Sequence, residues 1–241
     1  MGNVVIYERD HFTGGVEGDL VMTDTVIFDL DGTLLNTLDD LADSTNYALS
    51  QFGLPMRQVA EIRSFVGNGV ELLIERAVEG RLSKEDEQRC LDIFKQHYSE
   101  NMNNKTRPYD GILELVRQLL EQRYHIAIVS NKFDSAVKEL NVTYFEGLFP
   151  VAIGASEKIA KKPAPDSVYE ALAQLQSVGE NAIYIGDSDV DVLTAHNAGL
   201  SCVGVTWGFR DRELLLSVGA EYIIDEPKEL FMILDRRNSD C

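Results

Sequence analysis

From residue 109 onward, short apolar segments alternate with segments of helical periodicity, and this alternation constrains the fold more than any other feature of the chain. Strands are expected at residues 126–129, 151–153, 182–185, 202–205 and 222–224. Helices are expected at residues 112–120, 133–140, 166–175 and 190–198. Repeated strand–helix units of this kind predict a parallel sheet that is covered by helices on both faces.

A helical block interrupts this pattern near the N-terminus. Residues 26–28 are apolar and rich in β-formers, which predicts a first buried strand. Residues 38–52, 70–78 and 84–99 then have helical periodicity, and Thr37 to Asp40 resembles a helix start with a variant capping box. We therefore predict an α/β protein with a Rossmann-like parallel sheet core and an inserted helical cap domain.

The expected domain boundaries follow from this pattern. Residues 1–22 lack clear periodicity, and we expect them to be a dispensable leader. The α/β catalytic core is expected at residues 23–36 and 106–241, and the helical cap at residues 37–105.

Two carboxylates directly follow the first predicted strand. Asp29 and Asp31 stand at its carboxyl end, and Gly32 turns the chain. Ligands of open parallel sheets bind just beyond the carboxyl ends of the strands. Paired carboxylates repel each other and resist desolvation unless a cation or a catalytic demand holds them. The alternative is an Asp-rich turn without chemistry, because Asp and Gly are ordinary turn residues.

Two groups suited to a phosphate follow later strands. Ser130 and Asn131 come after residues 126–129, where a hydroxyl and a free backbone N–H at a helix start suit a phosphate oxygen. Lys162 precedes Pro163, which stiffens the backbone and makes the lysine begin a loop rather than a helix. Each has a simpler alternative, since Ser-Asn is a common helix cap and lysines before such turns are usually solvated.

A further pair of carboxylates follows the strand predicted at residues 182–185. Gly186 allows a close turn, Asp187 stands at the strand end, and Asp191 lies one helical turn further on and can face the same way. Asp189 is expected to be a solvated charge at the start of a helix. Because all these groups lie at strand ends, we expect one shared site.

Together the motifs resemble those of the haloacid dehalogenase superfamily. Asp-x-Asp-Gly-Thr-Leu at residues 29–34 matches its first motif, and the later motifs occur in the same order. In that superfamily a second Asp marks phosphatases and phosphotransferases, where dehalogenases carry Tyr and P-type ATPases carry Thr. The resemblance implies that Asp29 is a nucleophile that forms an aspartyl-phosphate, and that Asp31 is the general acid and base.

The resemblance also implies a magnesium site. The expected ligands are the Asp29 carboxylate, the backbone carbonyl of Asp31 and the Asp187 carboxylate. Mg²⁺ suits such a site because it tolerates few carboxylates together with phosphate and waters.

The resemblance further implies which groups surround the phosphoryl group and the metal. Ser130, the backbone N–H of Asn131 and Lys162 are expected to hold the phosphoryl oxygens. Behind the metal ligands we expect Thr33, Ser188 and Asp191, with Asp191 orienting water or Lys162.

The helical insert is expected to select the substrate. Residues 63–77 contain Val-Gly-x-Gly before a helix that ends in Glu-Arg-Ala, similar to the cap of phosphoglycolate phosphatases. Gly67 and Gly69 permit close backbone approach, although a Gly-rich turn between helices explains them equally well. We expect Arg63 and Asn68 to meet a distal carboxylate of the substrate, with a surface charge as the alternative for Arg63.

We therefore expect a Mg²⁺-dependent phosphomonoester hydrolase that acts on 2-phosphoglycolate. A pyrophosphatase, or a phosphatase of nucleotides or sugar phosphates, would use the same core. A transferase of the phosphoglucomutase type fits less well, since those usually carry Val where Thr33 stands. A non-catalytic phosphate-binding protein is disfavoured because every expected reactive group is present.

Composition limits the partners. The formal net charge is −18, from 40 acidic and 22 basic residues, so nucleic acid and anionic membranes are not expected as partners. The three cysteines form no Cys-x-x-Cys pair, and no apolar run approaches the roughly 20 residues that span a membrane. We expect a cytoplasmic monomer or homodimer that binds a small phosphorylated metabolite.

Overall fold

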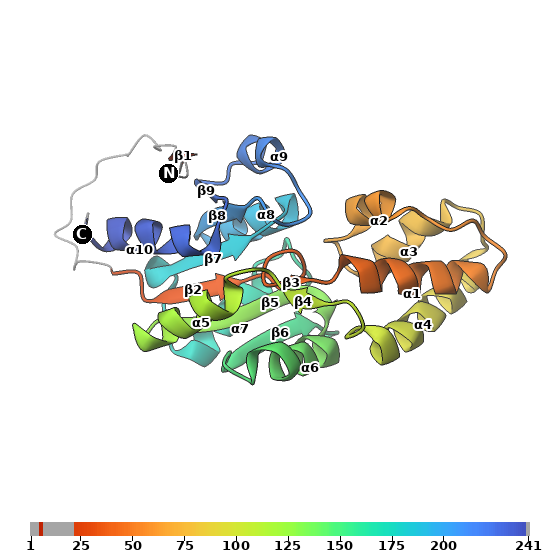
Figure 1. Cartoon of the computed structure of the whole chain (residues 1–241), viewed down its shortest axis with the longest axis horizontal. Coiled ribbons are helices and arrows are strands. Elements are labelled where there is room, and N and C mark those ends of the chain that lie inside the picture. Colours follow the sequence, from red (N-terminus) through yellow and green to blue (C-terminus); the bar gives the residue numbers. More distant parts are fainter. Residues whose placement is uncertain (1–4, 7–21, 240–241) are drawn as a thin grey trace.

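The computed structural model describes residues 5–6 and 22–239, which form an α/β core and a helical cap (Figure 1). In this part of the chain the core contains a seven-stranded sheet with the order β1-β9-β8-β7-β2-β5-β6, in which only β1 is antiparallel. The strands are β1 (Val5–Ile6), β2 (Thr25–Phe28), β5 (His125–Phe133), β6 (Val151–Ala155), β7 (Ala182–Gly186), β8 (Ser201–Val205) and β9 (Tyr222–Ile224).

Helices cover both faces of the sheet, as predicted. One face packs against α5 (Ile112–Glu121), α6 (Asp134–Phe145) and α10 (Leu230–Ser239), and the other against α7 (Asp166–Leu175), α8 (Asp189–Ala198) and α9 (Arg212–Ser217). Side chains alternate along β2, so Val26 and Phe28 enter one apolar cluster and Ile27 enters the other. Short 3₁₀ turns at Gly179–Asn181 and Pro227–Glu229 precede β7 and α10.

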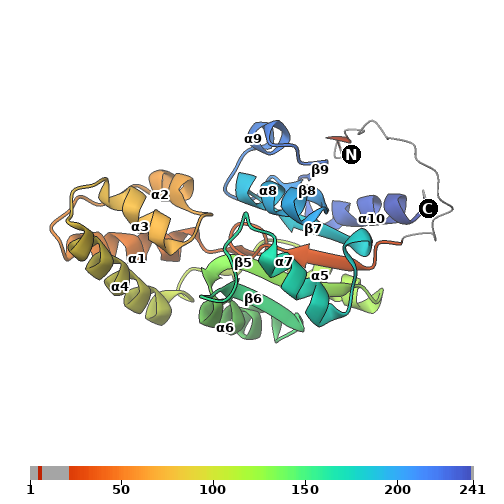
Figure 2. The same cartoon turned by 180° about the vertical axis from the view of Figure 1, so that it is seen from behind.

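The cap lies beyond the carboxyl ends of the core strands in both views (Figures 1 and 2). A two-stranded antiparallel ribbon of β3 (Leu35–Asn36) and β4 (Arg107–Pro108) connects it to the core. Its helices in the described chain are α1 (Leu38–Ser50), α2 (Val59–Phe65), α3 (Val70–Val78) and α4 (Lys84–Asn101). All four fall within the residues that we predicted for the cap.

The expected capping box at the start of α1 is wrong. The Thr37 hydroxyl makes no capping bond and instead donates to Asp31 Oδ1 at 2.7 Å. The Asp40 carboxylate accepts bonds from the backbone N–H groups of Lys105 and Thr106, at 2.8–3.0 Å. Both side chains therefore tie the cap junction to the core, which a local capping pattern cannot indicate.

The next helix was expected from residue 133, one residue before its observed start, but the strand end predicted at residue 129, ahead of residues 130–132, is wrong. Strand β5 continues through them, and α6 begins only at Asp134. The pairing of β5 with β6 shifts register between Val129 and Phe133, so the strand is irregular where it carries polar side chains.

Most of the predicted leader lies outside the described residues. Val5 and Ile6 are described, and they pair antiparallel with Ile223 and Tyr222 at the edge of the sheet. That the leader is dispensable stays a prediction. Among the described residues, every helix is too short or too polar to cross a lipid bilayer.

Candidate active site

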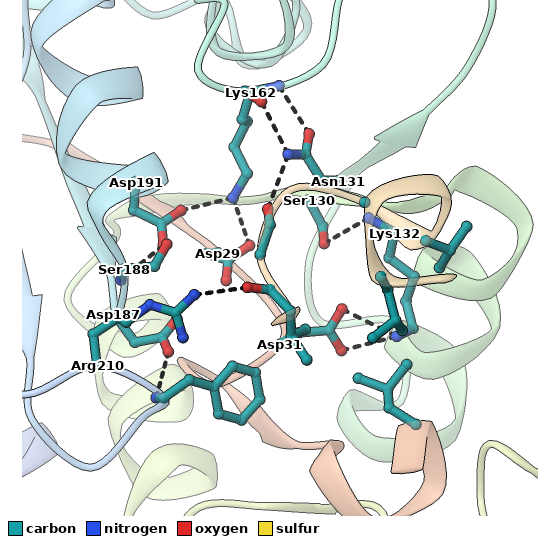
Figure 3. A pocket seen from close by; sticks show the side chains of 17 residues that line it. Asp29, Asp31, Ser130, Asn131, Lys132, Lys162, Asp187, Ser188, Asp191 and Arg210 are labelled. Atoms are coloured by element: carbon teal, nitrogen blue, oxygen red, sulfur yellow. Dashed lines mark hydrogen bonds and ion pairs between the residues drawn. The ribbon is translucent and has the colours of Figure 1, made fainter. Parts of the chain in front are cut away.

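The strand order brings the predicted motifs together. Strand β2 lies between β5 and β7 and pairs in parallel with both. Parallel pairing aligns the carboxyl ends of these strands, so Asp29 after β2 lies beside Ser130 in β5 and Asp187 after β7 (Figure 3). The backbone N–H of Asp29 donates to the carbonyl of Ile185 at 2.9 Å, which extends the ladder to the site.

A buried cluster of carboxylates occupies this position. Among the described residues, Asp29, Asp187 and Asp191 each place one carboxylate oxygen within 4.8 Å of the others, with at most 6% of each residue exposed. Burial, followed by the charge of Asp191, raises the pKa of Asp29 well above its usual range. The same two causes raise the pKa of Asp187 to about 7.

These residues fit a divalent cation. Hard cations prefer carboxylate oxygens, and a bound cation would offset both the desolvation and the mutual repulsion that raise these pKa values. The expected ligands Asp29 and Asp187 belong to the cluster, and Asp191, which was expected behind them, belongs to it too. The role of the Asp31 carbonyl stays a prediction.

Lys162 neutralises part of the cluster. Its Nζ donates to Asp29 Oδ1 at 2.6 Å, to Asp191 Oδ1 at 2.7 Å and to the Tyr184 hydroxyl at 3.1 Å. Only 5% of the residue is exposed, and the nearby carboxylates hold the pKa of its ammonium well above its usual value despite burial. The ammonium is therefore fixed where it can meet a phosphoryl oxygen beside the proposed nucleophile.

The Asn131 side chain positions Lys162, which we did not anticipate. Its Oδ1 accepts the Lys162 N–H at 2.8 Å, and its Nδ2 donates to the Lys162 carbonyl at 3.0 Å and to the Gly67 carbonyl of the cap at 3.1 Å. One amide therefore joins the Lys162 loop, strand β5 and the cap. From the sequence, only the backbone N–H of Asn131 was expected to act in the site.

Asp187 is enclosed by two backbone segments that leave no room for side chains. A Cβ on Gly32 would lie 2.3 Å from Asp187 Oδ2, and a Cβ on Gly208 would lie 2.3 Å from Asp187 Cβ. Phe209 donates its backbone N–H to Asp187 Oδ2 at 2.6 Å, and Thr33 donates its hydroxyl to Asp187 Oδ1 at 3.3 Å. Thr33 thus contacts Asp187, and its expected role behind a metal ligand stays a prediction.

Ser188 and Asp191 bond to each other at the start of α8. The Ser188 hydroxyl and backbone N–H donate to Asp191 Oδ2 at 2.6 Å and 3.1 Å. Asp191 Oδ1 remains directed at Lys162, as expected. Asp189 points away to Arg210 at 3.5 Å, and 39% of its side chain is exposed.

Lys132 is a site residue that the sequence analysis missed. Its Nζ donates to both carboxylate oxygens of Asp31, at 2.8 Å and 3.0 Å, and lies 4.6 Å from the ring centroid of Tyr98 in the cap. Strand β5 continues to Phe133, but its pairing shifts register between Val129 and Phe133, and Ser130, Asn131 and Lys132 all line the site. Regular alternation along a strand therefore does not predict this placement of Lys132.

A cavity of about 40 Å³ lies between the carboxylates and the cap. Asp29, Asp31, Ser130, Lys132 and Lys162 line its core side. The residues that line its cap side are Leu41, Val66, Gly67, Gly69, Val70 and Leu73.

Two of the four predicted cap contacts therefore reach this cavity. Gly67 and Gly69 line it, and Gly69 directly precedes α3. Arg63 and Asn68 are not among its lining residues in the described structure. The Arg63 guanidinium bonds to a core loop, and Asn68 Oδ1 accepts from Arg76 at 2.9 Å. Arg210, which the sequence analysis did not consider, lines the cavity instead.

Comparisons with known proteins agree with this arrangement. Residues 26–205 match the model of the haloacid dehalogenase-like hydrolase family. The chain is 32% identical over 215 residues to phosphoglycolate phosphatase of Haemophilus influenzae, which covers 86% of this chain and 96% of the relative. The corresponding enzyme of Mannheimia succiniciproducens is 33% identical, with the same coverage. The crystal structure of a predicted phosphoglycolate phosphatase from Haemophilus somnus superposes with a TM-score of 0.82 at 29% identity, covering 87% of this chain and 97% of that one.

Proposed function

This chain belongs to the haloacid dehalogenase-like hydrolase family, and we propose that it is a divalent-metal-dependent phosphatase that hydrolyses 2-phosphoglycolate. The observation that carries the chemistry is the buried contact of Lys162 with Asp29 and Asp191, beside Asp187. A buried carboxylate and ammonium that are held together beside a cavity suit attack on a phosphoryl group. We propose Mg²⁺ as the cation, since it combines readily with carboxylates, phosphate and water.

The proposed reaction has two steps. In the first, an oxygen of Asp29 attacks phosphorus while Asp31 donates a proton to the leaving oxygen of glycolate. In the second, Asp31 takes a proton from water, the water oxygen attacks phosphorus, and phosphate leaves as the Asp29 carboxylate is restored. When bound, a divalent cation supplies positive charge that offsets the charge of the carboxylates and the phosphoryl oxygens.

Other residues of the chain hold the reacting groups. Ser130, the backbone N–H of Asn131 and Lys162 bind the phosphoryl oxygens in this proposal. Lys132 and Thr37 orient Asp31 through bonds to its carboxylate at 2.7–3.0 Å. Val66, Val70 and Leu73 of the cap cover the cavity with apolar groups, which limits access of water during the first step.

Two features support 2-phosphoglycolate as the substrate. The cavity is small, so a compact phosphomonoester fits the arrangement of cap and core better than a nucleotide does. Lys132 and Lys162 approach it from different sides (Figure 3), which suits a substrate with two anionic ends. Pyrophosphate shares this property and is the second candidate substrate. A cytoplasmic location and a monomeric or homodimeric state stay predictions.

A substrate panel tests the choice of substrate. We expect kcat/KM for 2-phosphoglycolate to exceed the values for pyrophosphate, sugar phosphates and nucleoside monophosphates by at least about 10-fold, because a well-placed charge pair contributes about 1.5 kcal/mol or more. Phosphate release is measured under equal Mg²⁺ concentrations. The highest kcat/KM for pyrophosphate would make the second candidate the substrate.

Metal removal tests the reaction class. Chelation with EDTA is expected to stop phosphate release from p-nitrophenyl phosphate and from 2-phosphoglycolate, and added Mg²⁺ is expected to restore it. The reason is that the clustered carboxylates cannot approach a phosphate dianion without a cation. Activity that survives EDTA would contradict metal dependence, and no release with Mg²⁺ present would favour a non-catalytic phosphate-binding protein.

A further inference from the structure

Two arginines cross the boundary between cap and core in opposite directions. Arg63, from α2 of the cap, donates Nε to the Phe209 carbonyl at 2.8 Å and a terminal nitrogen to the Gly208 carbonyl at 2.6 Å. Arg210, from the core, donates to the Arg63 and Val66 carbonyls of the cap, at 2.8 Å each. We call Arg63 and Arg210 the arginine clasp.

The core side of this clasp is the loop that holds Asp187. The Gly208 and Phe209 carbonyls accept from Arg63, and the Phe209 N–H donates to Asp187 Oδ2 at 2.6 Å. The Gly208–Phe209 peptide therefore has a cap arginine on its carbonyl and the candidate metal ligand on its N–H. Gly208 also packs so closely on Asp187 that a side chain at this position would clash with it.

We propose that the arginine clasp couples docking of the cap to the placement of Asp187. Arg63 is a positioning residue that acts through the Gly208–Phe209 peptide rather than a residue that binds substrate. When the cap moves away, Arg63 releases both carbonyls and the Phe209 N–H loses its fixed direction. The inference rests on the proposed function only in that Asp187 binds the divalent cation.

The geometry of arginine suits this role. A guanidinium offers donors in a planar fork, so Arg63 can fix two successive carbonyls at once. Fixing two carbonyls sets the orientation of the peptide plane between them and thereby the direction of its N–H. Groups that orient metal ligands in this way commonly change metal affinity when they are removed.

Metal binding without substrate tests the proposal. In Arg63→Met, we expect the Kd of Mn²⁺, used as a probe of the divalent site, to rise about 3- to 10-fold, which is at or below the usual effect of a group bonded directly to a ligand. Free Mn²⁺ is measured by electron paramagnetic resonance. The control is Arg57→Met, because Arg57 donates to the Ala77 carbonyl at 2.7–2.8 Å entirely within the cap, and its Mn²⁺ affinity is expected to stay within about twofold of wild type.

Two outcomes would overturn the proposal. If Arg63→Met binds Mn²⁺ as the wild type does and only KM for 2-phosphoglycolate rises, Arg63 contacts the substrate. If Arg57→Met weakens Mn²⁺ binding as much as Arg63→Met does, the effect is a general loss of cap packing.

A second variant covers the case in which Arg63→Met does not fold. Arg63→Lys keeps the charge but cannot fix two carbonyls with a planar fork, so its Mn²⁺ affinity is expected to fall too, and wild-type affinity would contradict the proposal. Because no substrate is present in these measurements, a failed substrate assignment leaves their result unchanged.

Discussion

Replacing Asp29 by Asn is expected to lower kcat for phosphate release by at least about 10⁴-fold, because an amide cannot form the aspartyl-phosphate. The change is nearly isosteric, and the amide oxygen can still accept the bond from Lys162. It also removes one charge from a buried carboxylate cluster, so in EDTA the free energy of unfolding should not fall. Steady-state kinetics with 2-phosphoglycolate and urea unfolding measure the two effects separately.

Asp166→Asn is the matched control for this variant. Asp166 is an exposed carboxylate at the start of α7, beyond the carboxyl end of β6, and it does not line the cavity. Its kcat is expected to remain within about threefold of wild type, as for most exposed positions. Normal kcat in Asp29→Asn would show that Asp29 is not the nucleophile. An equal loss of kcat in both variants would show that activity depends on the net charge at the carboxyl end of the sheet rather than on a nucleophile at Asp29.

Replacing Lys162 by Met is expected to reduce both activity and stability. The ammonium bonds to Asp29 and Asp191, and 3% of its side chain is exposed. Without it, the buried carboxylates lose the ammonium that neutralises part of their charge. The free energy of unfolding in EDTA should therefore fall by about 3–5 kcal/mol. We expect kcat to fall by about 10²–10³-fold, because a fixed donor to the phosphoryl group is lost.

Lys161→Met is the control, since Lys161 is the neighbouring residue with the same side chain. It bonds to Glu71 at the surface, with 39% of its side chain exposed. A surface pair contributes little, so its free energy of unfolding should change by less than about 1 kcal/mol. Added Mg²⁺ should recover part of the stability lost in Lys162→Met, as measured by urea unfolding. A Lys162→Met protein as stable as wild type in EDTA would show that the carboxylates do not depend on this ammonium.

Hydrophobic periodicity along the sequence was sufficient to predict most of the helices and strands of the core. The predicted helices at residues 70–78 and 166–175 agree with α3 and α7 at both ends, because amphipathic spacing begins there directly after Gly69 and Pro165. Helix α2, with seven residues, was missed because so short a segment gives a weak periodic signal. The end of β5 was predicted too early, at residue 129 instead of Phe133, because polar side chains after an apolar run normally indicate the end of a strand.

The motifs located the carboxylates of the site but not the groups that hold them. Asp29, Asp187 and Lys162 could be expected to meet, because each stands at or near a strand end of a parallel sheet. Lys132 could not be assigned to Asp31, since its role depends on the irregular end of β5. Arg210 carries no recognisable signal, because it interacts with carbonyls about 145 residues away in the sequence.

The amino-acid sequence by itself determined the class of fold, the insertion of a helical cap and the acidic residues around which phosphoryl chemistry is built. These follow from local periodicity and from motifs whose spacing is short enough to read along the chain. Only the tertiary structure decided which donors hold those acids and where the cap docks. Such bonds join segments that are distant in sequence, and a donor such as Arg63 or Asn131 has several acceptors within reach until packing selects one.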